Sequence, residues 1–261
     1  MYAQIAIIGG TGVYNPDILS DVKEEVVVTP YGSVPVKIGQ YRNRSLAFLN
    51  RHGDGHSLPP HLVNYRANIA ALKKIGVKFI LATAAAGSIN PAMLPGHFVF
   101  VDQFLDFTKC RQSTFFDGGA SGVVHIDMTH PYCAELRDVL FRAARSARLT
   151  AHPTGTYVCT EGPRFETAAE IQMYRLVGGD LVGMTGVPEA PLAREMEMCY
   201  AAVAMVTNFA AGISPTNLTH QEVLDNMRLS GENIRELLMQ TVLWIDQDRS
   251  CVCHHGIEST M

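Results

Sequence analysis

The chain has 261 residues, of which 47% are hydrophobic and 18% charged, and its formal net charge at pH 7 is −4. This composition predicts a folded globular protein, and the length suits one large α/β domain. The absence of a Lys/Arg block argues against nucleic acid or an anionic membrane as a partner. No apolar stretch reaches transmembrane length and no basic segment precedes the apolar N-terminal run, so we expect a cytoplasmic protein without membrane contact.

Short apolar runs typical of buried strands alternate with helix-like stretches along most of the chain. Strands are expected at residues 4–8, 45–49, 78–83, 97–101, 156–159, 181–183 and 199–207. Helices are expected at residues 62–75, 134–147, 167–176, 188–196 and 218–245. Thr167 and Glu170 have the spacing of a capping box at the start of one of these helices. The alternation predicts a single α/β domain over residues 1–248, with helices flanking a largely parallel sheet.

Six cysteines lie at positions 110, 133, 159, 199, 251 and 253. Their scattered placement does not indicate a secreted disulfide framework, and the first four are expected to be buried apolar fillers. Cys251 and Cys253 belong to a Cys-Val-Cys-His-His sequence near the C-terminus. We expect residues 249–261 to be a flexible tail, with a redox pair and a metal-binding stub as alternatives.

Two motifs follow predicted strands and suit an anion. The turn Gly9-Gly10-Thr11-Gly12 would let backbone N–H groups approach a phosphate, and the Thr11 hydroxyl adds a donor. Arg51 and His52 follow the next strand and could clamp an anion with guanidinium and imidazole donors. A plain tight turn and an exposed polar loop remain the alternatives for the two motifs.

Four further segments place small or polar residues after predicted strands. Their candidate contact residues are Ala84 and Ala85, then Phe165 and Glu166, then Met184 and Thr185, and finally Asn208. Ligands of open α/β sheets gather at the carboxyl ends of strands, so these segments could meet at one site. Each also has a structural interpretation, such as helix packing, a charge at a helix N-terminus, core filling or turn formation.

Together these segments resemble the trimeric purine nucleoside phosphorylase and methylthioadenosine phosphorylase family over residues 5–224. The longest shared motif is GTYVCTEGPRFETAAEI, followed by GMTGVPEAPLARE. The resemblance implies the nucleoside phosphorylase fold, a single domain with a central mixed β-sheet flanked by helices. It also implies a homotrimer or dimer of trimers, no cofactor or metal, and inorganic phosphate as a co-substrate.

The resemblance further implies roles for individual residues. The phosphate pocket would comprise Thr11, Arg51, His52, Thr185 and the backbone around Ala84 and Ala85. Met184 would lie beneath the sugar and Phe165 against the base, with Glu166 and Asn208 as base readers and Ala210 beside them. His220 would face the 5′-hydroxyl, and His125 would be lent to the neighbouring subunit. Asn208 and His52 would be the catalytic residues.

The implied reaction is phosphate-dependent cleavage of 6-oxopurine nucleosides, inosine and guanosine, to free base and ribose 1-phosphate. Methylthioadenosine phosphorylases typically carry aspartates at the places of Asn208 and Ala210, and this chain has neither. The alternative within the family is an S-methyl-5′-thioinosine or S-methyl-5′-thioadenosine phosphorylase. Outside it, a Rossmann-type oxidoreductase would need an acidic residue at the end of the second strand, and a binding protein of the same fold would lack catalysis.

Overall fold

The computed structural model describes residues 2–10, 18–53, 55, 57–214, 220–248 and 251–255. Its strands are β1 (Ile5–Gly9), β2 (Ser20–Thr29), β3 (Gly32–Tyr41), β4 (Arg44–Asn50), β5 (Phe79–Ser88), β6 (Phe98–Phe100), β7 (Gln103–Phe107), β8 (Ala151–His152), β9 (Thr156–Thr160), β10 (Leu181–Gly183) and β11 (Cys199–Phe209). Its α-helices are α1 (Tyr65–Lys74), α2 (Ala134–Ser146), α3 (Ala168–Leu176), α4 (Glu189–Glu195) and α5 (His220–Trp244). Short 3-10 turns are η3 (Pro60–Leu62), η4 (Gly119–Ser121) and η5 (Val252–His255).

The strands form one mixed sheet, in the order β2-β3-β4-β1-β5-β10-β9-β7. β11 pairs in parallel along the other edge of β5, and β6 and β8 extend the sheet beyond β11. β1, β4, β5 and β11 run in one direction. β10 runs antiparallel to β5, and β9 and β7 run parallel to β10. The predicted α/β fold with a central mixed sheet is therefore confirmed.

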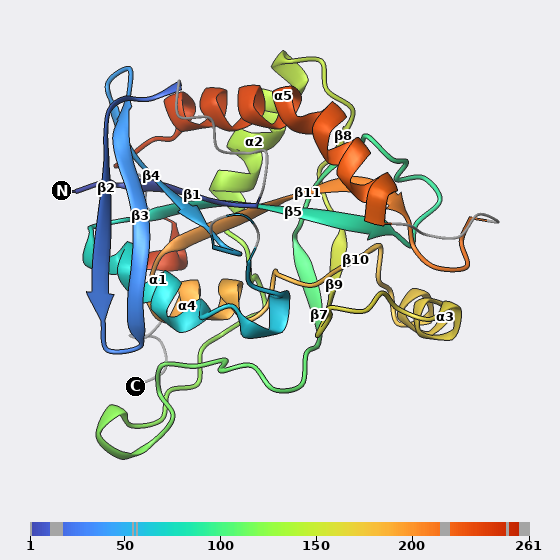
Figure 1. Cartoon of the computed structure of the whole chain (residues 1–261), viewed down its shortest axis with the longest axis horizontal. Coiled ribbons are helices and arrows are strands. Elements are labelled where there is room, and N and C mark those ends of the chain that lie inside the picture. Colours follow the sequence, from blue (N-terminus) through green and yellow to red (C-terminus); the bar gives the residue numbers. More distant parts are fainter. Residues whose placement is uncertain are drawn as a thin grey trace.

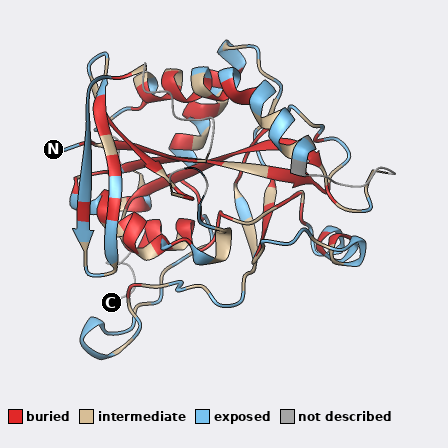
Figure 2. Cartoon of the chain, in the orientation of Figure 1, coloured by how far each residue is buried: buried red, intermediate tan, exposed pale blue. Residues whose placement is uncertain are grey.

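Helices cover both faces of this sheet (Figure 1). α1 and α4 contact each other on one side, while α2 and α5 contact each other and β11 on the other. Figure 2 shows that β1, β5 and β11 are buried along almost their whole length, whereas β2 is mostly exposed. Strands covered on both faces become continuous apolar runs, which is why the sequence signalled them clearly. No helix of the described residues is long and apolar enough to span a membrane.

The β2-β3 hairpin was not predicted. Its outer strand begins with charged residues and is mostly exposed, and even Val26 and Val28 are 61% exposed, so the usual buried-strand signal is absent. The hairpin also weighs against the Rossmann alternative. That alternative needs an acidic residue at the end of the second strand, but Asp21, Glu24 and Glu25 lie inside β2, which ends at Thr29. β2 is also an edge strand that pairs antiparallel with β3.

The short strands β7 and β8 were also not predicted, and the other local signals had mixed outcomes. The capping box is present, since the Thr167 hydroxyl accepts from the Glu170 N–H and the Glu170 carboxylate accepts from the Thr167 N–H. Cys133, Cys159 and Cys199 are buried as expected, but Cys110 is exposed in the loop after β7 and is not a core filler. Within the segment expected to be a flexible tail, Cys253 is buried in the core between β11 and α2.

Candidate active site

A gap in the strand pairing of β5 creates space for a ligand. On one edge of β5, residues Phe79–Ala82 pair with β1 and residues 87–88 pair with β10. Among the described residues no strand pairs with 83–86 on that edge, so the backbone there is open to other partners. Because β1 and β10 run toward each other, their carboxyl ends face across this gap. Ligand sites form at such ends of strands.

A cavity of about 450 Å³ occupies this position. It is lined by candidate residues from five segments, namely Arg51, His52, Ala84, Ala85, Phe165, Glu166, Met184, Thr185, Asn208 and Ala210. Val223, Leu224 and Met227 of α5 line it as well. The volume is within the range of small-molecule sites, and the structure thus brings most of the predicted residues together.

Arg51 is held by a partner that the sequence analysis missed. Its Nε and Nη2 donate to the two carboxylate oxygens of Glu189 at 2.8 and 2.7 Å, and its Nη1 donates to the carbonyl of Thr83 at 2.8 Å. Both side chains of the ion pair are almost fully buried. Three of the five guanidinium N–H groups are thus used, leaving two for an anion among the described residues. The pair orients Arg51 at the open edge of β5.

Glu189 itself is the first residue of α4, where a carboxylate also interacts favourably with the helix dipole. The Tyr200 hydroxyl donates to its Oε1 at 2.7 Å. In the sequence, Glu189 appeared only as one letter of a family motif. Nothing in its local pattern indicated that it pairs with a residue 138 positions away.

His52 and Thr185 lie on opposite sides of the same gap. The Nδ1 of His52 donates to the carbonyl of Leu58 at 2.9 Å, and this contact fixes the orientation of the imidazole ring. Thr185 follows β10, and its backbone N–H donates to the Tyr157 hydroxyl at 3.4 Å. Both residues line the cavity, so their side chains can converge on a small anion together with Arg51.

Asn208 ends the buried part of β11 with its amide in a defined orientation. The Thr207 hydroxyl donates to its Oδ1 at 2.7 Å, and its Nδ2 donates to the carbonyl of Phe209 at 2.8 Å. Since an amide carries two N–H groups, one remains to donate to a ligand. Gly87 makes room for this side chain, because a Cβ at that position would lie 3.1 Å from the Asn208 Nδ2.

Glu166 reaches the cavity from the loop between β9 and α3. Its Oε1 accepts a hydrogen bond from the Thr160 hydroxyl at 2.6 Å. Burial raises the pKa of the Glu166 carboxyl above its ordinary value, and this effect outweighs the opposing effect of the Thr160 hydrogen bond. The site therefore combines a carboxylate acceptor at Glu166 with an amide donor at Asn208.

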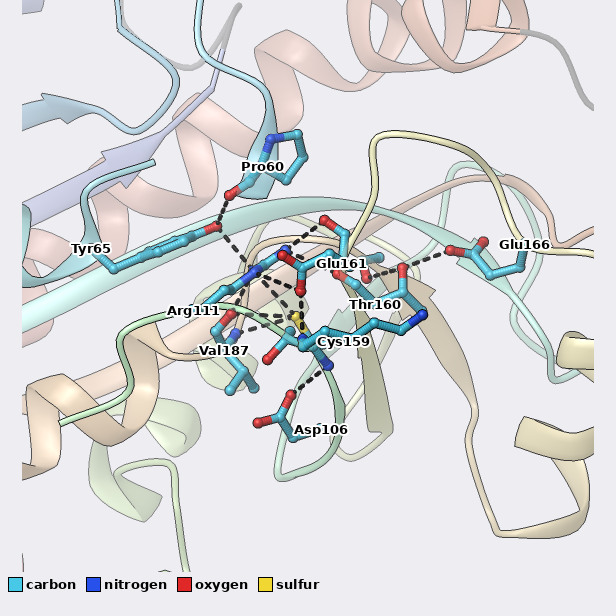
Figure 3. A network of polar contacts seen from close by, with 12 residues as sticks. Pro60, Tyr65, Asp106, Arg111, Cys159, Thr160, Glu161, Glu166 and Val187 are labelled. Carbon is cyan, nitrogen blue, oxygen red and sulfur yellow. Dashed lines mark hydrogen bonds and ion pairs between the residues drawn. The ribbon is translucent and has the colours of Figure 1, made fainter. Parts of the chain in front are cut away.

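Arg111 contacts Thr160, the partner of Glu166, and ties together the chain segments that carry the site (Figure 3). Its Nη2 donates to the carbonyls of Thr160 and Glu161 at 3.0 and 2.9 Å, and its Nη1 donates to the carbonyl of Val187 at 2.6 Å. The side chain is 2% exposed and lies over the ring of Tyr65. Arg111 thus braces the end of β9 that orients Glu166. It lies in a loop with no recognisable motif, so nothing in its sequence surroundings marked it as a site residue.

Three predicted residues are not placed in this cavity. Thr11 lies outside the described residues, and so does the side chain of His220, although its backbone begins α5. His125 is exposed and is not among the lining residues. Its expected contribution to a neighbouring subunit stays a prediction.

Comparison with known proteins agrees with this arrangement. A family model described as the phosphorylase superfamily matches residues 4–243. The chain belongs to this superfamily. It is 55% identical over 260 residues to a probable 6-oxopurine nucleoside phosphorylase of Thermococcus kodakarensis, covering 98% of this chain and 97% of that one.

Two further members of the superfamily are also similar to this chain. The chain is 54% identical to a 6-oxopurine nucleoside phosphorylase of Pyrococcus furiosus, with 98% of each chain covered. A crystal structure of a methylthioadenosine phosphorylase from an Antarctic soil metagenomic library superimposes with a TM-score of 0.93 at 38% identity, covering 99% of this chain and 92% of that one. The superfamily fold is therefore established over nearly the whole chain.

Proposed function

We propose that this protein is a purine nucleoside phosphorylase that cleaves 6-oxopurine nucleosides with inorganic phosphate, releasing free base and ribose 1-phosphate. The observation that carries the proposal is that the Glu166 carboxylate and the Asn208 amide, each held by its own hydrogen bonds, line one cavity together with Arg51. A 6-oxopurine offers an N1–H donor to a carboxylate, and its O6 and N7 accept from an amide. The names of the similar phosphorylases support the same activity.

The proposed reaction separates two charges. As the glycosidic bond breaks, the base leaves with negative charge and the sugar becomes oxocarbenium-like. The amide of Asn208 stabilises the leaving base, because a fixed donor acts most strongly where charge develops. Phosphate held by Arg51, His52 and Thr185 balances the positive sugar and attacks C1, so no covalent enzyme intermediate is needed. In this proposal the chain's own residues both stabilise the leaving base and hold the phosphate, without a cofactor.

Base selectivity tests the proposal. Adenosine has an acceptor at N1, so the carboxylate oxygen of Glu166 that faces the base would have no donor there, which costs on the order of 1–3 kcal/mol. We therefore expect kcat/KM for inosine to exceed that for adenosine by about ten- to a hundred-fold or more. Steady-state kinetics on both substrates measures the ratio, and similar values would contradict the proposed base contacts. Asn208→Asp should shift the ratio toward adenosine, incompletely because Ala210 supplies no second carboxylate.

The raised pKa of Glu166 predicts opposite pH dependences of activity and stability. Activity on inosine needs the ionised carboxylate, so kcat/KM should fall as the pH drops through the raised pKa. The folded state binds this proton more tightly than the unfolded state does. The contribution of Glu166 to stability is therefore fully present below the ordinary pKa of glutamate and is lost as the pH rises through the raised pKa of the folded state.

Glu166→Gln separates these two effects. The variant should lose activity on inosine and lose the acidic limb of the pH-rate profile, yet unfold at a higher temperature than the wild type at neutral pH without ligands. Thermal unfolding and kcat/KM across the acid range measure both. A variant that keeps the acidic limb would show that a different group controls it.

A second candidate is supported by the apolar side chains of α5 in the cavity wall. Val223, Leu224 and Met227 would suit a 5′-methylthio group, as in S-methyl-5′-thioinosine. His220, at the start of the same helix, would instead suit a 5′-hydroxyl, with a hydrogen bond worth roughly 1 kcal/mol. We favour the hydroxyl. His220→Val should lower efficiency on inosine and raise it on methylthioinosine, and a wild type that prefers methylthioinosine would establish the second candidate.

The proposal includes a homotrimer or a dimer of trimers in the cytoplasm. The exposed position of His125 leaves it available to a neighbouring subunit, in line with the role that the family resemblance implies.

A further inference from the structure

Four cysteines from distant parts of the chain meet in one cluster. Cys133 precedes α2, Cys199 begins β11, and Cys251 and Cys253 lie in the C-terminal segment around η5. Their Sγ atoms all lie within 4.8 Å of one another. None of the four is part of a disulfide in this structure, and Cys133, Cys199 and Cys253 are buried. We call this group the cysteine tetrad.

From this cluster we infer that the cysteine tetrad is a structural zinc site. Zn²⁺ binds four thiolates tetrahedrally at about 2.3 Å, which places neighbouring sulfur atoms about 3.8 Å apart. In the structure no two Sγ atoms of the tetrad are more than 4.8 Å apart, and those of Cys199 and Cys251 are 3.2 Å apart. Small shifts of the side chains would therefore bring the four sulfur atoms around a single ion. A four-iron cluster would need wider spacing, because each thiolate there binds a different iron.

The surroundings of the cysteine tetrad can also accommodate the charge of a zinc-thiolate site. Binding of Zn²⁺ by four thiols releases four protons to solvent and leaves the site with two negative charges. Cys133 is the N-cap of α2, and no side chain caps this end, so the partial positive charge of the helix N-terminus faces the site. Arg137, one turn further along α2, is close enough to interact electrostatically with Cys133. Its buried Nε has no hydrogen-bond partner among the described residues.

The position of the cysteine tetrad indicates a structural role. Cys199 and Asn208 lie at opposite ends of β11, about 30 Å apart at the usual rise of a strand. Four protein ligands would also close the coordination sphere and leave no place for a substrate. The ion would instead fasten the C-terminal segment to the starts of α2 and β11, where Cys253 already packs in the core.

Zinc content of the intact protein tests the inference. Protein purified under reducing conditions without added metal or chelator should contain about one Zn²⁺ per chain by elemental analysis. Cys253→Ser should reduce the zinc content at least several-fold and lower the unfolding temperature, while Cys110→Ser, which changes an exposed cysteine outside the tetrad, should leave both unchanged. The Cys253→Ser variant should retain phosphorolysis at low temperature, since the active site is remote.

A second measurement does not depend on the variant folding. Exchange of the wild-type metal for Co²⁺ should give the intense visible absorption of tetrahedral cobalt with thiolate-to-metal charge transfer. Two results would overturn the inference. One is wild-type protein that contains no zinc and takes up no Co²⁺ after reduction. The other is mass spectrometry of protein purified without reductant that finds the four cysteines joined as two disulfides and no metal bound.

Discussion

Glu189→Ala should lower the free energy of unfolding by about 3–5 kcal/mol, because it leaves the buried guanidinium of Arg51 without its carboxylate partner. Chemical denaturation of the phosphate-free protein measures this loss. The reason is desolvation: both partners are hidden from water, so the remaining charge cannot be solvated when the other is removed. Inorganic phosphate should restore part of the loss, since the anion can take the place of the carboxylate beside Arg51.

The exposed ion pair between Arg142 and Asp138 on α2 provides the control. Asp138→Ala should cost less than about 1 kcal/mol, because water solvates the remaining charge. The wild type and the Glu189→Ala variant should also differ in the shift of unfolding temperature that phosphate causes, with the larger shift in the variant. If Glu189→Ala costs no more than Asp138→Ala, the Arg51-Glu189 pair does not hold the cavity wall as described.

Asn208→Ala should lower kcat/KM for inosine by about 10²–10³-fold, the usual effect of removing one donor that stabilises developing negative charge. The phosphate concentration at half-maximal rate should change little, because Asn208 lies at the end of β11 and not beside Arg51. Initial rates at varied inosine and phosphate separate the two parameters.

Thr207→Val is a milder variant that tests the same contact. It removes the hydroxyl that holds the Oδ1 of Asn208 but leaves the amide in place, so the loss should be only about five- to ten-fold, corresponding to one hydrogen bond. An Asn208→Ala variant that retains activity within a few-fold of the wild type would rule out the amide as the group that stabilises the leaving base.

The parts of the fold that the sequence predicted are those whose signal is local. β1, β5 and β11 are continuous apolar runs, and α3 carries its own capping box. The exposed strand β2 gave no such signal, because its exposed face tolerates Lys and Glu. Elements that gain their stability from distant packing or from an edge position are harder to predict from a single sequence.

The site shows the same division. Arg51, Glu166 and Asn208 could be selected because each follows a strand expected from the sequence and matches a family motif. Glu189, Arg111 and the cysteine tetrad act through contacts between segments far apart in the chain. The sequence showed the two tail cysteines as a pair, but only the folded chain brings Cys133 and Cys199 to them.

The phosphate requirement of base release tests the central claim most directly. Purified protein is incubated with inosine, with and without inorganic phosphate, and hypoxanthine and ribose 1-phosphate are quantified. The cavity described here predicts hypoxanthine only when phosphate is present, with one ribose 1-phosphate formed for each base released. Release of hypoxanthine and free ribose without phosphate would show that water is the nucleophile, and would contradict the assignment of Arg51, His52 and Thr185 to a phosphate.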